Sequence, residues 1–200
     1  MTKIKICGLK REEDINYANN LKLDYIGFVF AEKSKRYVSL EEAKKLKNLL
    51  SNEIKSVGVF VNESIENILR YIDEDIIDII QLHGDETEEY ISKLKSKTNN
   101  KIIKAFEVKS ENDLELAKNS SADYILLDSG KGTGKTFDWN KIKSFDRNFF
   151  LAGGISKENI NEAIDKFNPY ALDASSSLET NDVKDFEKMK EFVEIVRRKR

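Results

Sequence analysis

The sequence predicts an α/β protein that folds as one (β/α)8 barrel, a TIM barrel, over residues 1–200. Short apolar stretches alternate with charged stretches of helical spacing, which is typical of βαβ units and a parallel sheet. The pattern occurs eight times, and a barrel of this type needs about 200 residues. The apolar stretches expected to form strands are 3–7, 24–30, 54–61, 76–82, 101–106, 123–128, 148–152 and 169–173.

Amphipathic helices are expected between these strands. Ser39 followed by Glu42 is typical of a capping box at a helix start, and Ser156 followed by Asn159 is a weaker version of it. The clearest apolar faces with helical spacing lie in 39–50, 64–72 and 183–196.

A doubly wound open sheet is the alternative fold. That fold would more often have five or six strands and a glycine-rich loop after the first one. Here the glycine-rich segments follow the sixth and seventh apolar stretches, at 129–136 and 153–154. Because the phosphate site of (β/α)8 barrels is usually built late in the chain, this placement favours the barrel.

Composition narrows the class of protein. The net charge is −2 and the chain has one cysteine, so we expect no nucleic-acid partner, no internal disulfide and no cysteine-based metal site. No apolar run reaches 18 residues, and the first ten residues alternate instead of forming a signal peptide. We therefore expect a cytoplasmic protein without a membrane segment.

A thiol and a carboxyl end two of the predicted strands. Cys7 ends the first and Asp128 ends the sixth, and strand ends of this kind meet at one rim of a parallel barrel. They are candidates for an acid/base pair, with the pKa of the thiol lowered toward neutrality by neighbours and that of the carboxyl raised. Alternatively, Cys7 is a small buried apolar residue and Asp128 caps the following segment.

Two late loops are candidates for binding phosphate. Gly153 and Gly154 follow the seventh stretch, just before a helix whose N-terminus favours anions, although a tight turn would also explain them. Ser175 and Ser176 follow the eighth stretch and offer hydroxyl and amide groups. Because both loops follow the last two strands, we expect a small phosphorylated substrate.

Residues 129–136, SGKGTGKT, resemble a nucleotide-binding P-loop, but Ser129 stands where that motif begins with glycine. Phe137, Asp138 and Trp139 also interrupt the run of small residues that would begin the helix of such a motif. We favour a loop with glycine hinges that closes over a ligand, and nucleotide binding stays the alternative.

Arg36 and His83 are further candidates for substrate binding at the rim. Arg36 follows the second stretch and could grip a carboxylate or phosphate, although most single arginines are solvated. His83, the only histidine, ends the fourth stretch, where a structural role is an equal alternative.

Motifs along the whole chain resemble the phosphoribosylanthranilate isomerase family. They are KICGL, DYIGFVF followed by SKRYVS, VGVFVN, QLHGDE, LLDSGKGTGKTFDW, LAGGI and DASSSLE, in the order of that family. The resemblance implies a (β/α)8 barrel that converts N-(5'-phosphoribosyl)anthranilate to 1-(2-carboxyphenylamino)-1-deoxyribulose 5-phosphate in tryptophan biosynthesis. It also implies an Amadori rearrangement without cofactor or metal.

The resemblance assigns a role to each candidate. It implies that Cys7 is the general base, Asp128 the general acid and Arg36 the group that holds the anthranilate carboxylate. The phosphate would be held by Gly153, Gly154, Ser175 and Ser176.

This chain departs from the family pattern at three positions. Lys35 replaces a proline and Lys131 replaces a glycine, while Ser177 replaces the glycine of a Ser-Ser-Gly motif. If that glycine has a positive φ, Ser177 costs on the order of 1 kcal/mol of strain. We then expect weaker substrate binding with the chemistry retained.

Two other functions stay open. One is a barrel enzyme acting on another phosphorylated sugar: a metal-dependent epimerase would need more than one histidine, whereas an indole-glycerol-phosphate synthase could use Lys104. The other is a non-catalytic phosphate-ligand binder. We expect a monomer rather than a homodimer.

Overall fold

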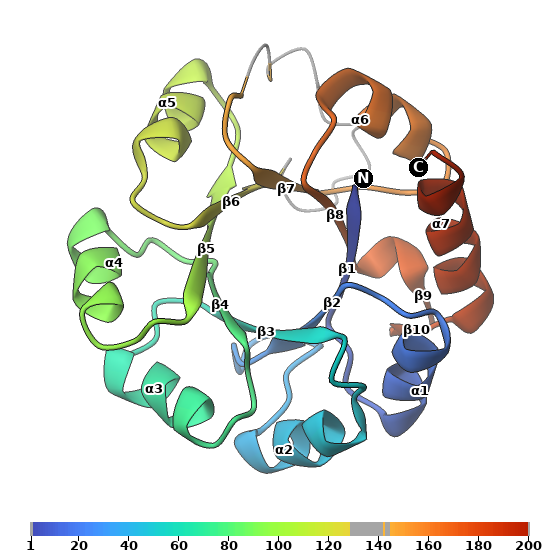
Figure 1. Cartoon of the computed structure of the whole chain (residues 1–200), viewed down its shortest axis with the longest axis horizontal. Coiled ribbons are helices and arrows are strands. Elements are labelled where there is room, and N and C mark those ends of the chain that lie inside the picture. Colours follow the sequence, from blue (N-terminus) through green and yellow to red (C-terminus); the bar gives the residue numbers. More distant parts are fainter. Residues whose placement is uncertain (1, 129–141, 143–144, 200) are drawn as a thin grey trace.

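Eight parallel strands close into a ring, and helices surround it (Figure 1). The computed structural model describes residues 2–128, 142 and 145–199, and the predicted barrel is confirmed. Each strand pairs with its neighbours in the sequence, and β8 pairs with β1 to close the ring. The strands are β1 (Lys3–Cys7), β2 (Tyr25–Val29), β3 (Lys55–Phe60), β4 (Ile79–Leu82), β5 (Lys101–Glu107), β6 (Tyr124–Asp128), β7 (Phe149–Ala152) and β8 (Ala171–Ala174).

The described part of the chain has seven α-helices around the ring. The predicted capping box is confirmed at α2: the Glu42 amide donates to Ser39 Oγ, and the Ser39 amide donates to the Glu42 carboxylate at 2.8 Å. Most of the segment between β6 and β7 is outside the described residues. The helices are α1 (Glu12–Asn20), α2 (Leu40–Leu49), α3 (Ile65–Asp73), α4 (Glu88–Lys95), α5 (Glu111–Asn119), α6 (Ile160–Phe167) and α7 (Phe186–Arg198).

Three predicted boundaries differ from the structure by three residues or more. β4 begins at Ile79 instead of residue 76, because Ser56 Oγ donates to the Ile76 carbonyl and holds this segment out of the sheet. α6 begins at Ile160: Ser156 donates its hydroxyl to Glu158 and does not cap the helix, while Asn159 occupies the cap position.

The third difference lies before the last helix. α7 begins at Phe186 rather than 183, because residues 183–184 form the second strand of an unpredicted two-stranded hairpin. Its strands are β9 (Glu179–Thr180) and β10 (Val183–Lys184), and the Asp185 carboxylate then accepts the amides of Glu187 and Lys188 as the cap of α7.

Side-chain alternation separates the inside of the barrel from the strand–helix layer. The inner apolar cluster includes Val57, Ile103, Leu126 and Phe150. The residues before and after each of these along the strand point to the opposite face, toward the helices. In β1, Ile4 and Ile6 belong to the outer cluster, so the odd-numbered residues of this strand face inward. None of the helices in the described ranges is long and apolar enough to cross a membrane.

Arg147, just before β7, holds the end of α5. Its guanidinium donates at 2.6–3.1 Å to the carbonyls of Ala117, Lys118, Ser120 and Ala122. The last carbonyls of a helix have no partner within the helix, so this side chain satisfies them and joins α5 to the sheet.

We expect Arg147→Met to lower the free energy of unfolding by about 2 kcal/mol, because it removes charged hydrogen bonds from partly buried carbonyls. Urea denaturation measures this change. The control is Arg198→Met, since Arg198 makes an exposed ion pair with Glu194 and exposed pairs contribute about 0–1 kcal/mol. Equal losses in both variants would contradict the proposed role of Arg147.

Candidate active site

The thiol and the carboxyl predicted from the sequence both lie at the carboxyl-terminal rim of the barrel. Cys7 is the last residue of β1 and Asp128 the last residue of β6. Their inward neighbours on the same strands are Lys5 and Leu126, so both side chains point to the barrel interior. The rim thus offers one sulfur and one carboxyl from strands on different sides of the ring.

A buried ion pair lies directly below Cys7. Lys5 is fully buried, and its Nζ is 2.7 Å from Oδ2 of Asp173, which is 7% exposed. The β1–β8 register places these residues side by side. Burial lowers the pKa of Lys5, but the charges of Asp173 and Cys7 outweigh it, so the net shift is upward and Lys5 stays an ammonium.

The pKa of the Cys7 thiol is shifted the opposite way from our expectation. Burial raises it above the ordinary value of about 9, and Asp173 adds to this rise. Lys5 and Lys184 oppose it. The expected lowering toward neutrality is therefore wrong for the free protein, because the thiolate loses more hydration than the neighbouring cations restore.

Two glycines make room for the groups at this rim. An added Cβ at Gly27 would lie 2.7 Å from Cys7 Sγ, and one at Gly8 would lie 2.2 Å from Cδ of Arg36. Gly8 also has a positive φ of 83°. The glycine after Cys7 thus lets the Arg36 side chain cross the end of β1.

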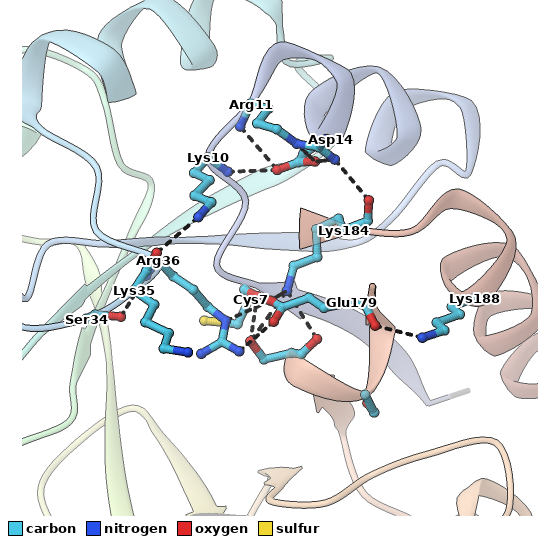
Figure 2. Close-up of polar contacts among 12 residues, drawn as sticks. Cys7, Lys10, Arg11, Asp14, Ser34, Lys35, Arg36, Glu179, Lys184 and Lys188 are labelled. Atoms are coloured by element: carbon cyan, nitrogen blue, oxygen red, sulfur yellow. Dashed lines mark hydrogen bonds and ion pairs between the residues drawn. The ribbon is translucent and has the colours of Figure 1, made fainter. Parts of the chain in front are cut away.

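Arg36 and Lys184 converge on one carboxylate, that of Glu179 (Figure 2). Arg36 binds it through Nε and Nη2, both at 2.7 Å, and Lys184 reaches it at 2.5 Å. Burial raises the pKa of Glu179, yet these two cations shift the net pKa below its usual range. Burial lowers the pKa of Lys184. The structure therefore fixes the guanidinium beside Cys7.

Sequence reasoning missed Glu179 and Lys184. Both belong to the β9–β10 hairpin, whose strands of two residues each are too short to leave an apolar pattern.

The loop in which Lys35 replaces the proline is held by two contacts. Lys10 donates to the Lys35 carbonyl at 3.1 Å, and the Lys35 side chain forms an exposed ion pair with Asp182.

The two candidate phosphate loops are joined by side chains. Gly153 and Gly154 have φ values of 82° and 65°, and an added Cβ at Gly154 would meet nothing within 4 Å. Ser177 lies in the short 3₁₀ helix η2 (Ser176–Leu178), and its hydroxyl donates to the Ile155 carbonyl at 2.6 Å. Its φ is not positive, so the expected strain at Ser177 is absent and the hydroxyl instead ties one loop to the other.

The remaining serines differ in their surroundings. Ser175 Oγ donates to the Cys7 carbonyl at 2.9 Å, and the Ser175 carbonyl accepts from Lys184 at 3.1 Å. Ser176 is exposed at the start of the 3₁₀ turn. Ser175 therefore also fixes the backbone of the residue that carries the thiol.

His83 lies between Gln81 and Asp128. Gln81 Nε2 is 2.9 Å from Nδ1 of His83, and Nε2 of His83 is 3.4 Å from Oδ2 of Asp128. With the amide nitrogen of Gln81 as donor, Nδ1 accepts and Nε2 carries the proton toward the carboxylate. The predicted substrate-binding role of His83 stays a prediction, while its contacts in the structure orient it toward Asp128.

Lys104 does not face the barrel interior. It alternates with Ile103 and Ala105 of the inner cluster, and its Nζ binds the Gly84 carbonyl at 2.6 Å and Glu86 at 3.0 Å. At this position Lys104 cannot serve as the catalytic lysine that an indole-glycerol-phosphate synthase would need inside the barrel.

Residues 129–136, including Lys131, lie outside the described residues. Within the described ranges, no group of three or more His, Cys, Asp or Glu side chains could hold a metal ion.

The comparisons with known proteins agree with each other. A family profile described as "N-(5'phosphoribosyl)anthranilate (PRA) isomerase" matches residues 4–195. The N-(5'-phosphoribosyl)anthranilate isomerase of Thermoanaerobacter sp. (strain X514) is 50% identical over an alignment 204 residues long, which covers 98% of each chain.

Solved structures give the same result. A phosphoribosylanthranilate isomerase in complex with reduced 1-(o-carboxyphenylamino)-1-deoxyribulose 5-phosphate is 37% identical, with a TM-score of 0.89 over 98% of this chain and 99% of that one. Monomers generated from the dimeric isomerase of Thermotoga maritima are 38% identical, with a TM-score of 0.88 over the same shares.

We expect Gly27→Ala to lower turnover by about 100-fold, because the new methyl group would displace Cys7 and a shift of about 1 Å can cost that much. Steady-state kinetics, corrected for the folded fraction, measure the effect. Gly58→Ala is the control: its Cβ would be as crowded, 2.9 Å from Ile77 and Phe60, but on the outer face. Turnover that falls equally in both variants would show that general crowding, not the position of Cys7, is responsible.

Proposed function

Because the chain belongs to the N-(5'-phosphoribosyl)anthranilate isomerase family, we propose that Cys7 and Asp128 carry out its reaction as general base and general acid. The protein is an isomerase of tryptophan biosynthesis. Its substrate, N-(5'-phosphoribosyl)anthranilate, is rearranged to 1-(2-carboxyphenylamino)-1-deoxyribulose 5-phosphate. The observation that carries the assignment is that one thiol and one carboxyl face inward at the same rim.

The first step is ring opening. The protonated Asp128 carboxyl donates its proton to the ribose ring oxygen, the C1–O bond breaks, and the anthranilate nitrogen supplies the electron pair that forms the iminium ion. His83 Nε2, 3.4 Å from Asp128, then faces the carboxylate that this step leaves and stabilises its charge.

The second step is proton removal at C2. The Cys7 thiolate takes the C2 proton of the iminium ion, and the C–H electron pair forms the enolamine. Protonation at C1 and loss of the proton on the C2 oxygen then give the ketone product. Ser175 donates to the Cys7 carbonyl at 2.9 Å and so holds the backbone that carries the thiol in a fixed position beside the substrate.

We assign the two anionic groups of the substrate to two groups of residues at the rim. Arg36 uses Nε and Nη2 for Glu179, so we assign its Nη1 side to the anthranilate carboxylate. The phosphate is assigned to the loops of Gly153, Gly154, Ser175 and Ser176, because the two glycines have positive φ values and the space beside Gly154 is open. The relative crystallised with the reduced product analogue supports a ligand with these two anionic groups.

Further features of the protein stay predictions. The single domain over residues 1–200, the cytoplasmic location and the absence of nucleic-acid partners follow from the sequence pattern and charge. The predicted monomer differs from the relative in Thermotoga maritima, which is described as dimeric.

We expect Cys7→Ala and Asp128→Asn each to reduce turnover at least 100-fold, since an acid or base group contributes about 10²–10⁴-fold. The loss of substrate fluorescence measures the reaction. His83→Asn is the comparison variant and should lose less than either, because it only assists Asp128. If Cys7→Ala turned over substrate as fast as the wild type does, the role of the thiol would be contradicted.

The rate should also depend on pH through both groups. The active form has the Cys7 thiolate together with the protonated Asp128 carboxyl, and burial raises the pKa of the thiol, so a rise in pH forms the base while it removes the acid. The profile of kcat/KM against pH should therefore be bell-shaped, level between the two pKa values and falling on either side. Circular dichroism at each pH controls for unfolding, and a profile that only rises with pH would contradict a protonated Asp128 as the acid.

A further inference from the structure

We propose that Lys5 is a positioning residue for the isomerisation, and that its buried ammonium, held by Asp173, stabilises the thiolate form of Cys7. This inference rests on the proposed role of Cys7 as the base. Lys5 lies two residues before Cys7 on β1, so both side chains leave the same inner face of the strand, about 7 Å apart along it.

Packing alone does not account for a lysine at this buried position. A fully buried lysine is rare, because removing an ammonium from water costs several kcal/mol, and an ion pair with Asp173 seldom recovers all of it. A well-packed apolar pair would serve a barrel core at least as well. We therefore expect the charge of Lys5 to affect a neighbouring functional group, and the neighbour toward the rim is the thiol of Cys7.

The geometry leaves Lys5 able to act on the sulfur. An ammonium has three N–H groups, and the Lys5 hydrogen bond to Asp173 Oδ2 at 2.7 Å uses one of them. The Cys7 thiolate is the anion that would need the others, because a buried anion without a charged or hydrogen-bonding partner is unstable. Burial raises the pKa of Cys7, and among the charges that lower this pKa, Lys5 has the largest effect.

The other charged groups around Cys7 are less suited to this role. Lys184 on β10 and Arg36 after β2 share the carboxylate of Glu179, which offsets one of their two charges, and Lys184 lowers the pKa of Cys7 less than Lys5 does. Asp173 on β8 disfavours the thiolate and acts through Lys5. Asp128 on β6 and His83 after β4 face each other. Lys5 is thus the cation that the sheet places beneath the sulfur.

The test is the pH dependence of Cys7 alkylation by iodoacetamide in the substrate-free protein, followed by mass spectrometry. Only the thiolate reacts, and Cys7 is the only cysteine of the chain, so the midpoint of the rate profile reports this thiol alone. We expect Lys5→Met to raise the midpoint by about 1 pH unit or more, as for the loss of an adjacent opposite charge. Lys5→Arg should restore most of the shift.

The matched control is Lys104→Met, which makes the same substitution at a buried, ion-paired lysine that faces away from the barrel interior. Its midpoint should equal that of the wild type. If Lys5→Met raises the midpoint no more than Lys104→Met does, the proposal is wrong.

A second variant keeps the test decisive if Lys5→Met does not fold. Lys5→Gln keeps a hydrogen-bond donor for Asp173 but removes the positive charge. We expect its midpoint to rise above that of the wild type, whereas an unchanged or lowered midpoint overturns the proposal. Because alkylation requires no substrate, these outcomes are independent of whether isomerisation is observed.

Discussion

The closed parallel barrel imposes the constraint on which the rest of the site depends. Successive side chains of a strand point to opposite faces, and closure makes one of those faces the interior. Lys5, Cys7, Asp128 and Asp173 are all inward-facing positions, although 168 residues separate the two members of the buried ion pair. A shift of register by one residue in β1 would exchange Cys7 with Ile6 and place the thiol in the strand–helix layer. Chemistry at the rim is thus fixed by sheet register before any loop is considered.

The inner face is divided along the barrel axis. Near the amino-terminal ends of the strands, the rings of Tyr25, Tyr124 and Tyr170 surround Phe150, and Lys3 lies over two of these rings. Above them lies the buried Lys5–Asp173 pair, and the thiol and the carboxyl lie at the open rim. A buried charge costs free energy, so its neighbours must be charged or polar too. The loops add a second set of charges, in which Glu179 holds Arg36 and Lys184.

Much of this arrangement could be predicted from the sequence, and the limits have physical causes. The eight strands, the placement of Cys7 and Asp128 at one rim and the late glycine loops follow from periodicity and from the position of residues at strand ends. The Lys5–Asp173 pair could not be predicted, because in a strand of alternating Lys and Ile the lysines look solvent-facing. The β9–β10 hairpin leaves no periodic signal, so the carboxylate that binds Arg36 was missed. The sign of the Cys7 pKa shift depends on how much water the fold removes, and sequence does not report that.

The roles of the two rim groups are tested most directly by a kinetic isotope effect on substrate deuterated at C2 of the ribose, measured in Cys7→Ser and Asp128→Asn. A serine is a much weaker base than a thiolate, so removal of the C2 proton should limit the rate in Cys7→Ser, which should show a full primary isotope effect. In Asp128→Asn ring opening should limit the rate, and the isotope effect should be near one. Equal effects in the two variants, or a large effect only in Asp128→Asn, would contradict the assignment of the thiol as base and the carboxyl as acid.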